Sequence, residues 1–194
     1  MTLFNVLAAY ARLHEPWIDA VEAMGAASGF DVPSTGSEVA APIPLSVDEL
    51  VGTERLEPLL TVLRAQMGRL KWRQNPTYTD KLILGRYAYC ELLGPTGLVS
   101  HPTVSAGLLY LAPGTMYPPH AHPAEEAYHL LAGISEWQAG SAALTWRSPG
   151  DRMEHPRGIS HSMRSGTTPM LALYVWRGDL ATPARFVSEP SASE

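Results

Sequence analysis

Four side chains that can bind a metal ion, or act beside one, lie within one short stretch of this 194-residue sequence. They are His120, His122, Glu126 and Tyr128, in the segment GTMYPPHAHPAEEAYHLLAG. Because side chains alternate along a strand, His120 and His122 should share a face of one strand, and Glu126 and Tyr128 a face of the next. Two converging imidazoles and a carboxylate suit a divalent transition metal with open coordination positions. His161, further along the chain, is a candidate fourth ligand.

Tyr128 is the residue that narrows the chemistry. Its offset of two residues from Glu126 places the hydroxyl on the metal side of the strand. A nearby dication favours the phenolate and so lowers a pKa that is about 10 when unperturbed. Tyr128 can therefore be a ligand, a general base, or both in turn. The alternative is a plain core tyrosine, because strands favour this residue.

Aromatic side chains accompany these residues. Tyr117 precedes the first histidine by three residues, in a Met-Tyr-Pro-Pro segment that we expect to line the mouth of the site. Tyr174 and Trp176 lie in a later apolar run. Aromatic faces can hold a cationic substrate, for about 0.5 to 2 kcal/mol per contact. For any single aromatic residue, a place in the core is the competing interpretation.

Other reactive side chains have structural interpretations. His129 should point to the face opposite Tyr128 and be buried or lie behind the ligands. His155 lies near a turn and is interpreted as a solvated loop histidine. Glu125 is expected in solvent. Cys90, in an apolar run, is expected to be a buried small hydrophobe rather than a nucleophile.

The first 80 residues predict helices. Residues 3–24 carry apolar side chains at helical spacing, with Pro16 as a break or the start of a second helix. Residues 28–44 are rich in Ser, Gly and Pro and indicate a loop. Ser46–Glu49 has the pattern of a capping box, and residues 53–70 predict a further helix. These helices should pack on a barrel or on a second subunit, or act as a lid over the barrel mouth.

From about Lys81 the pattern changes to short apolar runs separated by Gly and Pro. Such runs predict an antiparallel barrel or sandwich. The expected strands are residues 81–93, 103–112, 127–132, 135–138, 142–147 and 170–176. We expect an N-terminal helical extension over residues 1–80, a β-barrel over residues 81–186, and a disordered tail over residues 187–194.

The composition excludes several classes of protein. Apolar residues make up 45% of the chain and charged residues 17%, which is typical of a globular protein. A net charge of -5 gives no electrostatic footprint for nucleic acid or an anionic membrane. One cysteine cannot form an internal disulfide. We find no pattern of a signal peptide or membrane span, so we expect a cytoplasmic protein.

The spacing of the first group of residues resembles the first motif of the cupin family. That motif has a glycine, five residues, His-x-His, three or four residues, a glutamate, six residues and a glycine. Gly114, His120, His122, Glu126 and Gly133 match it. The resemblance implies a small β-barrel that holds a metal on three histidines and a glutamate.

The second cupin motif is matched at four positions and missed at one. Gly150, Pro156, Gly158 and His161 fit, whereas Ser165 stands where an asparagine is expected. Because that asparagine is not a ligand in the family, the departure leaves the metal interpretation in place.

Within the cupins, the sequence is similar to the dimethylsulfoniopropionate lyases of the DddQ type. The resemblance rests on His-x-His-x3-Glu-x-Tyr, on a tyrosine three residues before the first histidine, and on the helical extension. It implies a carbon–sulfur lyase that cleaves dimethylsulfoniopropionate into dimethyl sulfide and acrylate. The implied metal ligands are His120, His122, Glu126 and His161, with Tyr128 as catalytic base. The implied substrate-binding aromatics are Tyr117, Tyr174 and Trp176.

Two other classes of function stay open. Another metal-dependent cupin enzyme, such as a dioxygenase or an isomerase of a small acid, can share the same ligand set. A non-catalytic small-molecule-binding cupin is the second alternative. Nitrogen and oxygen ligands suit Zn, Fe, Mn, Ni and Co alike, so the sequence does not select the metal. A homodimer is a further expectation, because cupins often pair.

Overall fold

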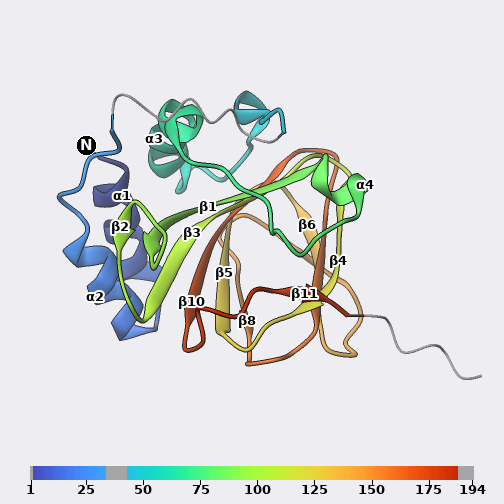
Figure 1. Cartoon of the computed structure of the whole chain (residues 1–194). Helices are drawn as coiled ribbons and strands as arrows, with labels where there is room; N and C mark the ends of the chain where they lie inside the picture. The colour runs from blue at the N-terminus through green and yellow to red at the C-terminus, as the bar shows by residue number, and fades with distance from the viewer. Residues whose placement is uncertain (1, 34–42, 188–194) are drawn as a thin grey trace, which may run out of the picture.

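Helices occupy the N-terminal part of the chain and strands the remainder (Figure 1). The computed structural model describes residues 2–33 and 43–187. The expected mainly β architecture with N-terminal helices is confirmed. Most of the expected loop over residues 28–44, and all but the first residue of the expected tail, lie outside the described residues.

The helices begin and end at recognisable signals. The Thr2 hydroxyl accepts a hydrogen bond from the Asn5 amide at 3.2 Å and caps α1, which ends two residues before Pro16. The break expected at Pro16 is therefore confirmed. The helical elements are α1 (Leu3–His14), α2 (Ile18–Ala26), η1 (Val47–Glu49), α3 (Glu57–Gln66), η2 (Met67–Arg69) and α4 (Lys81–Leu84).

Two local expectations were wrong. The side chain of Ser46 makes no capping hydrogen bond, and only the short 3-10 turn η1 follows it. The strand expected from Lys81 begins instead at Tyr87, because the carboxylate of Asp80 accepts a hydrogen bond from the Leu82 amide at 2.8 Å and starts α4. An N-cap thus overrides the apolar pattern over these residues.

The strands form two sheets that face each other. One sheet has the order β2-β1-β3-β10-β5-β8 and the other β11-β4-β9-β6-β7. Their pairs are antiparallel, except that β1 and β2 are parallel. The strands are β1 (Tyr87–Gly94), β2 (Val99–Ser100), β3 (Val104–Leu111), β4 (Met116–Ala121), β5 (Glu125–Ala132), β6 (Ser135–Ala139), β7 (Thr145–Arg147), β8 (Arg152–His155), β9 (His161–Ser165), β10 (Met170–Arg177) and β11 (Arg185–Phe186).

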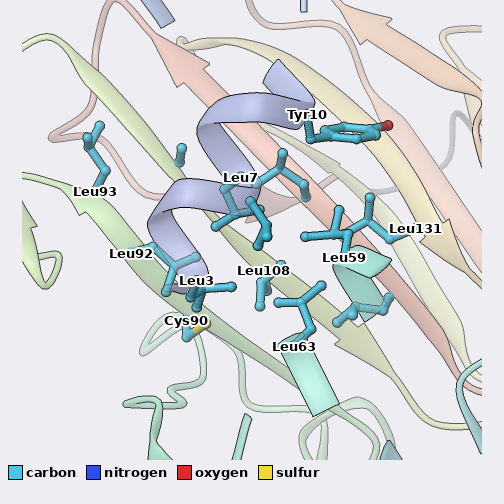
Figure 2. Close-up of a cluster of buried hydrophobic side chains, with 14 of the residues drawn as sticks. Leu3, Leu7, Tyr10, Leu59, Leu63, Cys90, Leu92, Leu93, Leu108 and Leu131 are labelled. Atoms are coloured by element: carbon cyan, nitrogen blue, oxygen red, sulfur yellow. The ribbon is translucent and has the colours of Figure 1, made fainter. Parts of the chain in front are cut away.

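The six-stranded sheet has an apolar surface on each face. Successive side chains of β3 alternate between the two faces of the sheet. Every residue of β3 is buried, because both faces are covered. Leu108 packs with Leu3 and Leu63 of the helices, whereas Leu109 packs with Tyr128 inside the barrel. Figure 2 shows side chains of α1 and α3 meeting those of β1 and β3. The helices therefore bury the outer face of the sheet and leave its inner face to the site.

Residue-level expectations outside the site were partly met. Cys90 is buried in this helix–sheet cluster, as expected. The expected strand over residues 142–147 is shorter, since β7 covers only Thr145–Arg147. Within the described residues, no helix combines the length and apolar character needed to cross a membrane.

Candidate functional site

The candidate ligands come from both sheets and meet between them. His120 lies near the end of β4 and pairs in register with His161 at the start of β9. His122 follows β4 directly, before the turn that leads to β5. Glu126 and Tyr128 extend from β5 in the opposite sheet. The site therefore depends on the packing of the two sheets as well as on local spacing.

Each of the three histidines is oriented through its Nδ1 atom by a backbone carbonyl. Nδ1 of His120 lies 2.9 Å from the carbonyl of Pro118, Nδ1 of His122 lies 3.1 Å from that of Ala124, and Nδ1 of His161 lies 3.0 Å from that of Ile159. A carbonyl only accepts hydrogen bonds, so each Nδ1 carries a hydrogen. In a neutral ring this leaves the Nε2 lone pair free to bind a metal.

Two of these Nε2 atoms converge on one carboxylate oxygen. Oε2 of Glu126 lies 2.9 Å from Nε2 of His122 and 3.0 Å from Nε2 of His161. All three side chains are buried, and Nε2 of His161 has no hydrogen-bond partner among the described atoms. Lone pairs and a carboxylate that face one another in a buried place are stabilised when a cation binds between them. The ligand atoms lie within 4.8 Å of one another and fit a divalent metal.

The charge state of the cluster agrees with this arrangement. Burial alone would raise the pKa of Glu126, but the neighbouring His122 and His161 imidazoles hold it well below its usual value. Burial lowers the pKa of His120 well below its usual value, so its ring is neutral. Glu126 is thus a carboxylate and His120 a neutral imidazole, the forms in which these side chains bind metals.

His120 lies beside this cluster rather than within it. Its ring centroid is 4.1 Å from that of His161, and its ring stacks on Tyr117 at 4.2 Å. The residues whose ligand atoms come together are His122, Glu126 and His161. His120 as a fourth ligand stays a prediction.

Tyr128 faces the same interior. Its side chain is 4% exposed and lines the same cavity as Glu126. Burial, and then the charge of Glu126, raise the pKa of Tyr128 well above its usual value. Without added positive charge, Tyr128 is therefore a neutral phenol.

The cavity beside the cluster has a volume of about 190 Å³, and aromatic side chains form part of its wall. Tyr117, Tyr174 and Trp176, the three aromatics singled out from the sequence, all line it. Trp176 also contacts two of the candidate ligands. Its indole N–H donates to Oε1 of Glu126 at 2.5 Å, and its ring stacks on that of His122 with the centroids 4.0 Å apart. Trp176 therefore orients two of the candidate ligands.

Several residues of the site were not singled out by sequence reasoning. Tyr87, Tyr89 and Glu91 line the cavity from the inner face of β1. The signal was present as the alternation Tyr-x-Tyr-x-Glu, but it lay within a run interpreted only as an apolar strand. Tyr78 also went unnoticed, although its hydroxyl lies 2.7 Å from that of Tyr117.

The interpretation of His155 as a solvated loop residue was wrong. It lies on β8, is 2% exposed, and stacks on His161 at 4.2 Å with the rings 9° from parallel. Neither ring nitrogen has a hydrogen-bond partner among the described atoms. Burial lowers the pKa of His155 to about 3. It is a neutral packing partner of a candidate ligand.

Comparison with known proteins identifies the family. The model of the dimethylsulfoniopropionate lyase family matches residues 34–172, which is more than half of the chain. The chain belongs to the dimethylsulfoniopropionate lyase family. This is a family of carbon–sulfur lyases, and the resemblance noted in the sequence is confirmed.

Members of the dimethylsulfoniopropionate lyase family are similar to the chain in sequence and in structure. Dimethylsulfoniopropionate lyase DddQ of Ruegeria pomeroyi is 40% identical over 99 residues, an alignment that covers 51% of this chain and 49% of that protein. The chain spans about half the length of the curated relatives that it matches. The crystal structure of DddQ from the same organism matches with a TM-score of 0.75 at 30% identity, over 95% of both chains.

A more distant structure bears on the fold alone. The sugar phosphate isomerase of the cupin superfamily from Silicibacter pomeroyi matches with a TM-score of 0.52 at 18% identity, over 63% of this chain and 80% of its own. The expected cupin fold is thereby confirmed.

Proposed function

We propose that this protein is a metal-dependent dimethylsulfoniopropionate lyase that releases dimethyl sulfide and acrylate by β-elimination. One observation carries the proposal. In a member of this family, His122, Glu126 and His161 bring their ligand atoms within 4.8 Å of one another, and Tyr128 lines the cavity that adjoins them. A metal site, a phenol and an aromatic wall are the three parts that this elimination needs.

The metal would be held by His122, Glu126 and His161, with His120 as a further ligand. Any of Zn, Fe, Mn, Ni and Co suits these donors. When bound, a divalent ion supplies Lewis acidity, which favours the ionised form of a neighbouring phenol and stabilises negative charge on a substrate carboxylate. The backbone carbonyls behind the imidazoles keep the rings in the required tautomer.

Tyr128 performs the proton transfer. Its phenolate oxygen takes a proton from the carbon next to the substrate carboxylate, and the electron pair of that C–H bond becomes the new C=C bond of acrylate. The C–S bond breaks with its electron pair on sulfur, so dimethyl sulfide leaves as a neutral molecule and no general acid is required. Such a positioned base contributes about 10² to 10⁴ in rate.

The aromatic walls accommodate the cationic end of the substrate. Tyr117, Tyr174 and Trp176 present ring faces or edges to the cavity, and a sulfonium is attracted to such faces. Tyr128 and Glu126 lie on the inner face of β5, so the substrate carboxylate is placed at that end.

We also propose a division of the chain that follows these roles. Residues 1–80 form an extension that packs on the barrel of residues 81–186, and the extension supports the sheet without contributing a ligand. A homodimer and a cytoplasmic location are part of the same proposal.

The proposed reaction is tested by measuring both products in the absence of oxygen. Purified protein reloaded with each divalent metal in turn is incubated anaerobically with dimethylsulfoniopropionate, and headspace dimethyl sulfide and dissolved acrylate are measured together. Equal amounts of the two products without oxygen are expected from elimination. A requirement for oxygen would contradict elimination and support the dioxygenase alternative, and no product with any metal would support a binding cupin.

A further inference from the structure

A second carboxylate, Glu91, lies on the wall of the cavity away from the candidate ligands. It extends from the inner face of β1, and it shares one row of the sheet with Gly107, Tyr174 and Tyr128, which follow it on β3, β10 and β5. All but Gly107 line the cavity. Glu91 and Tyr128 therefore lie at opposite ends of one row of register-paired residues that crosses the sheet.

The glycine in this row brings Tyr174 close to Glu91. A Cβ atom at Gly107 would lie 2.6 Å from the Tyr174 hydroxyl and 2.0 Å from the carbonyl of Cys90. The end of the Tyr174 side chain thus lies over the position where β3 has no side chain. At this position β3 places no side chain between the aromatic ring and the neighbouring strand that carries Glu91.

The carboxylate of Glu91 is fixed but not neutralised. Its Oε1 accepts a hydrogen bond from the Ser105 hydroxyl at 2.9 Å, and its Oε2 accepts from the amide of Thr96 at 3.1 Å and from the Thr96 hydroxyl. All of these donors are neutral. Arg73 donates to the hydroxyl and carbonyl of Thr96 at 2.7 and 2.8 Å, and no ion pair to Glu91 exists within the described residues.

The cavity wall therefore has a defined charge pattern. Glu126 and Glu91 are the carboxylates among its described lining residues, which include no lysine, arginine or histidine. A metal ion would more than offset Glu126, whereas Glu91 has no ion-pair partner within the described residues. One end of the cavity then suits an anion and the other a cation, with aromatic rings between them.

We infer that Glu91 is a specificity-determining residue of this cavity. It favours ligands that carry a positively charged group at the end opposite their carboxylate. The inference rests on the proposed function and adds to it the residue that recognises the sulfonium charge. Because the sulfonium loses its charge when the C–S bond breaks, Glu91 attracts the substrate and not the neutral sulfide. Its removal should therefore raise KM and should not lower kcat.

The test uses two unreactive ligands of one shape. Trimethylammoniopropionate carries the charge, and dimethylpentanoate replaces its trimethylammonium by a neutral tert-butyl group. Calorimetry on metal-loaded protein gives the affinity for each. We expect the wild-type protein to bind the cationic ligand more tightly, and Glu91→Gln to reduce the ratio of the two affinities about three- to tenfold, with affinity for the neutral ligand unchanged.

Two variants control for charge and folding. Glu49→Gln removes the same charge at an exposed position of η1 outside the cavity and should leave the ratio unchanged. Glu91→Asp keeps the charge and should retain most of the preference. If Glu91→Gln does not fold, the wild-type ratio should still fall as salt is raised, because a partly exposed charge is screened.

Three outcomes would overturn the inference: an unchanged ratio in Glu91→Gln, equal losses for both ligands, or a wild-type ratio near one. The measurement does not depend on turnover. A protein that shows the Glu91-dependent preference but releases no dimethyl sulfide would keep this inference and refute the lyase proposal.

Discussion

At the scale of single residues, the central feature is a phenol whose surroundings oppose its ionisation. Burial and the charge of Glu126 raise the pKa of Tyr128 well above its usual value. A base at this position therefore needs positive charge beside it, which the His122–Glu126–His161 cluster can hold. The same carboxylate thus has two opposed effects, since it disfavours the phenolate directly and favours it by binding a cation.

Replacing Tyr128 by phenylalanine tests the proposed base. Tyr128→Phe should lower kcat for dimethylsulfoniopropionate about 10²-fold or more, because the proton acceptor is lost. Metal content, measured by elemental analysis, should stay at the wild-type level if the phenol is a base and not an essential ligand. Both quantities are measured on the same samples.

Tyr89→Phe is the matched control. It removes another phenol from the cavity wall, and the Tyr89 hydroxyl makes no hydrogen bond within the described residues. Its kcat should stay within a few-fold of wild type. Normal turnover in Tyr128→Phe would mean that another group is the base.

At the scale of elements, a buried polar cluster fixes the helices to the sheet. Glu15, at the end of α1, lies 2.7 Å from Nε2 of His129 on β5 and 3.1 Å from Nη2 of Arg152 on β8. It also accepts a hydrogen bond from the amide of Trp17 at 2.8 Å. His129 is buried on the face of β5 opposite Tyr128, as the sequence predicted. The corner between α1 and α2 therefore sits on the back of the strand that carries Glu126.

Glu15→Gln should destabilise the protein by about 3 kcal/mol, because Arg152 and His129 lose the buried carboxylate that both of them contact. Urea unfolding followed by circular dichroism gives the free energy of unfolding. The control is Glu154→Gln, which removes the exposed partner of the same arginine at 2.7 Å and should change stability by less than about 1 kcal/mol. Equal effects of the two substitutions would refute a special role for the buried cluster.

The sequence predicts the parts of the site that lie on one strand better than the contacts between strands. The His-x-His and Glu-x-Tyr offsets place each pair on one strand face, and this follows from the alternation of side chains. Contacts between the two sheets do not follow from it. The stacking of His155 on His161 depends on how β8 of one sheet packs against β9 of the other. The indole of Trp176 reaches Glu126 through the register of β10 and β5 within one sheet, which local spacing also leaves undetermined.

At the scale of the whole molecule, folding stability should depend on acid. Burial opposes ionisation of Glu15, but hydrogen bonds from His129, Trp17 and Arg152 lower its pKa below the ordinary value of 4.5. The folded protein therefore binds this proton less readily than the unfolded chain. The stabilisation is complete above pH 4.5 and is lost as pH falls through the lower folded pKa.

Urea unfolding at a series of pH values measures this effect. The free energy of unfolding of the wild-type protein should fall below pH 4.5 with a slope of up to about 1.4 kcal/mol per pH unit from this one group. In Glu15→Gln that part of the slope should be absent. An identical pH profile in the two proteins would show that the pKa of Glu15 is not lowered by folding.

Fold class and general architecture were accessible from the sequence because they depend on repeated patterns. Helical spacing before residue 80 and short apolar runs after it predicted the helices and most of the longer strands. Boundaries set by one side chain were missed, as where Asp80 starts α4. The shape of the cavity was also missed, since it depends on Gly107 making room for Tyr174 from a strand distant in sequence.

The most direct test is a metal titration in which activity and metal content are measured on the same samples. The protein is stripped with a chelator, reloaded stepwise with one divalent metal, and assayed for bound metal and for dimethyl sulfide from dimethylsulfoniopropionate. We predict that release rises in proportion to bound metal and stops rising at a single ion per chain, and that Glu126→Gln lowers both. Full release from the metal-free protein, or wild-type metal binding in Glu126→Gln, would contradict the account.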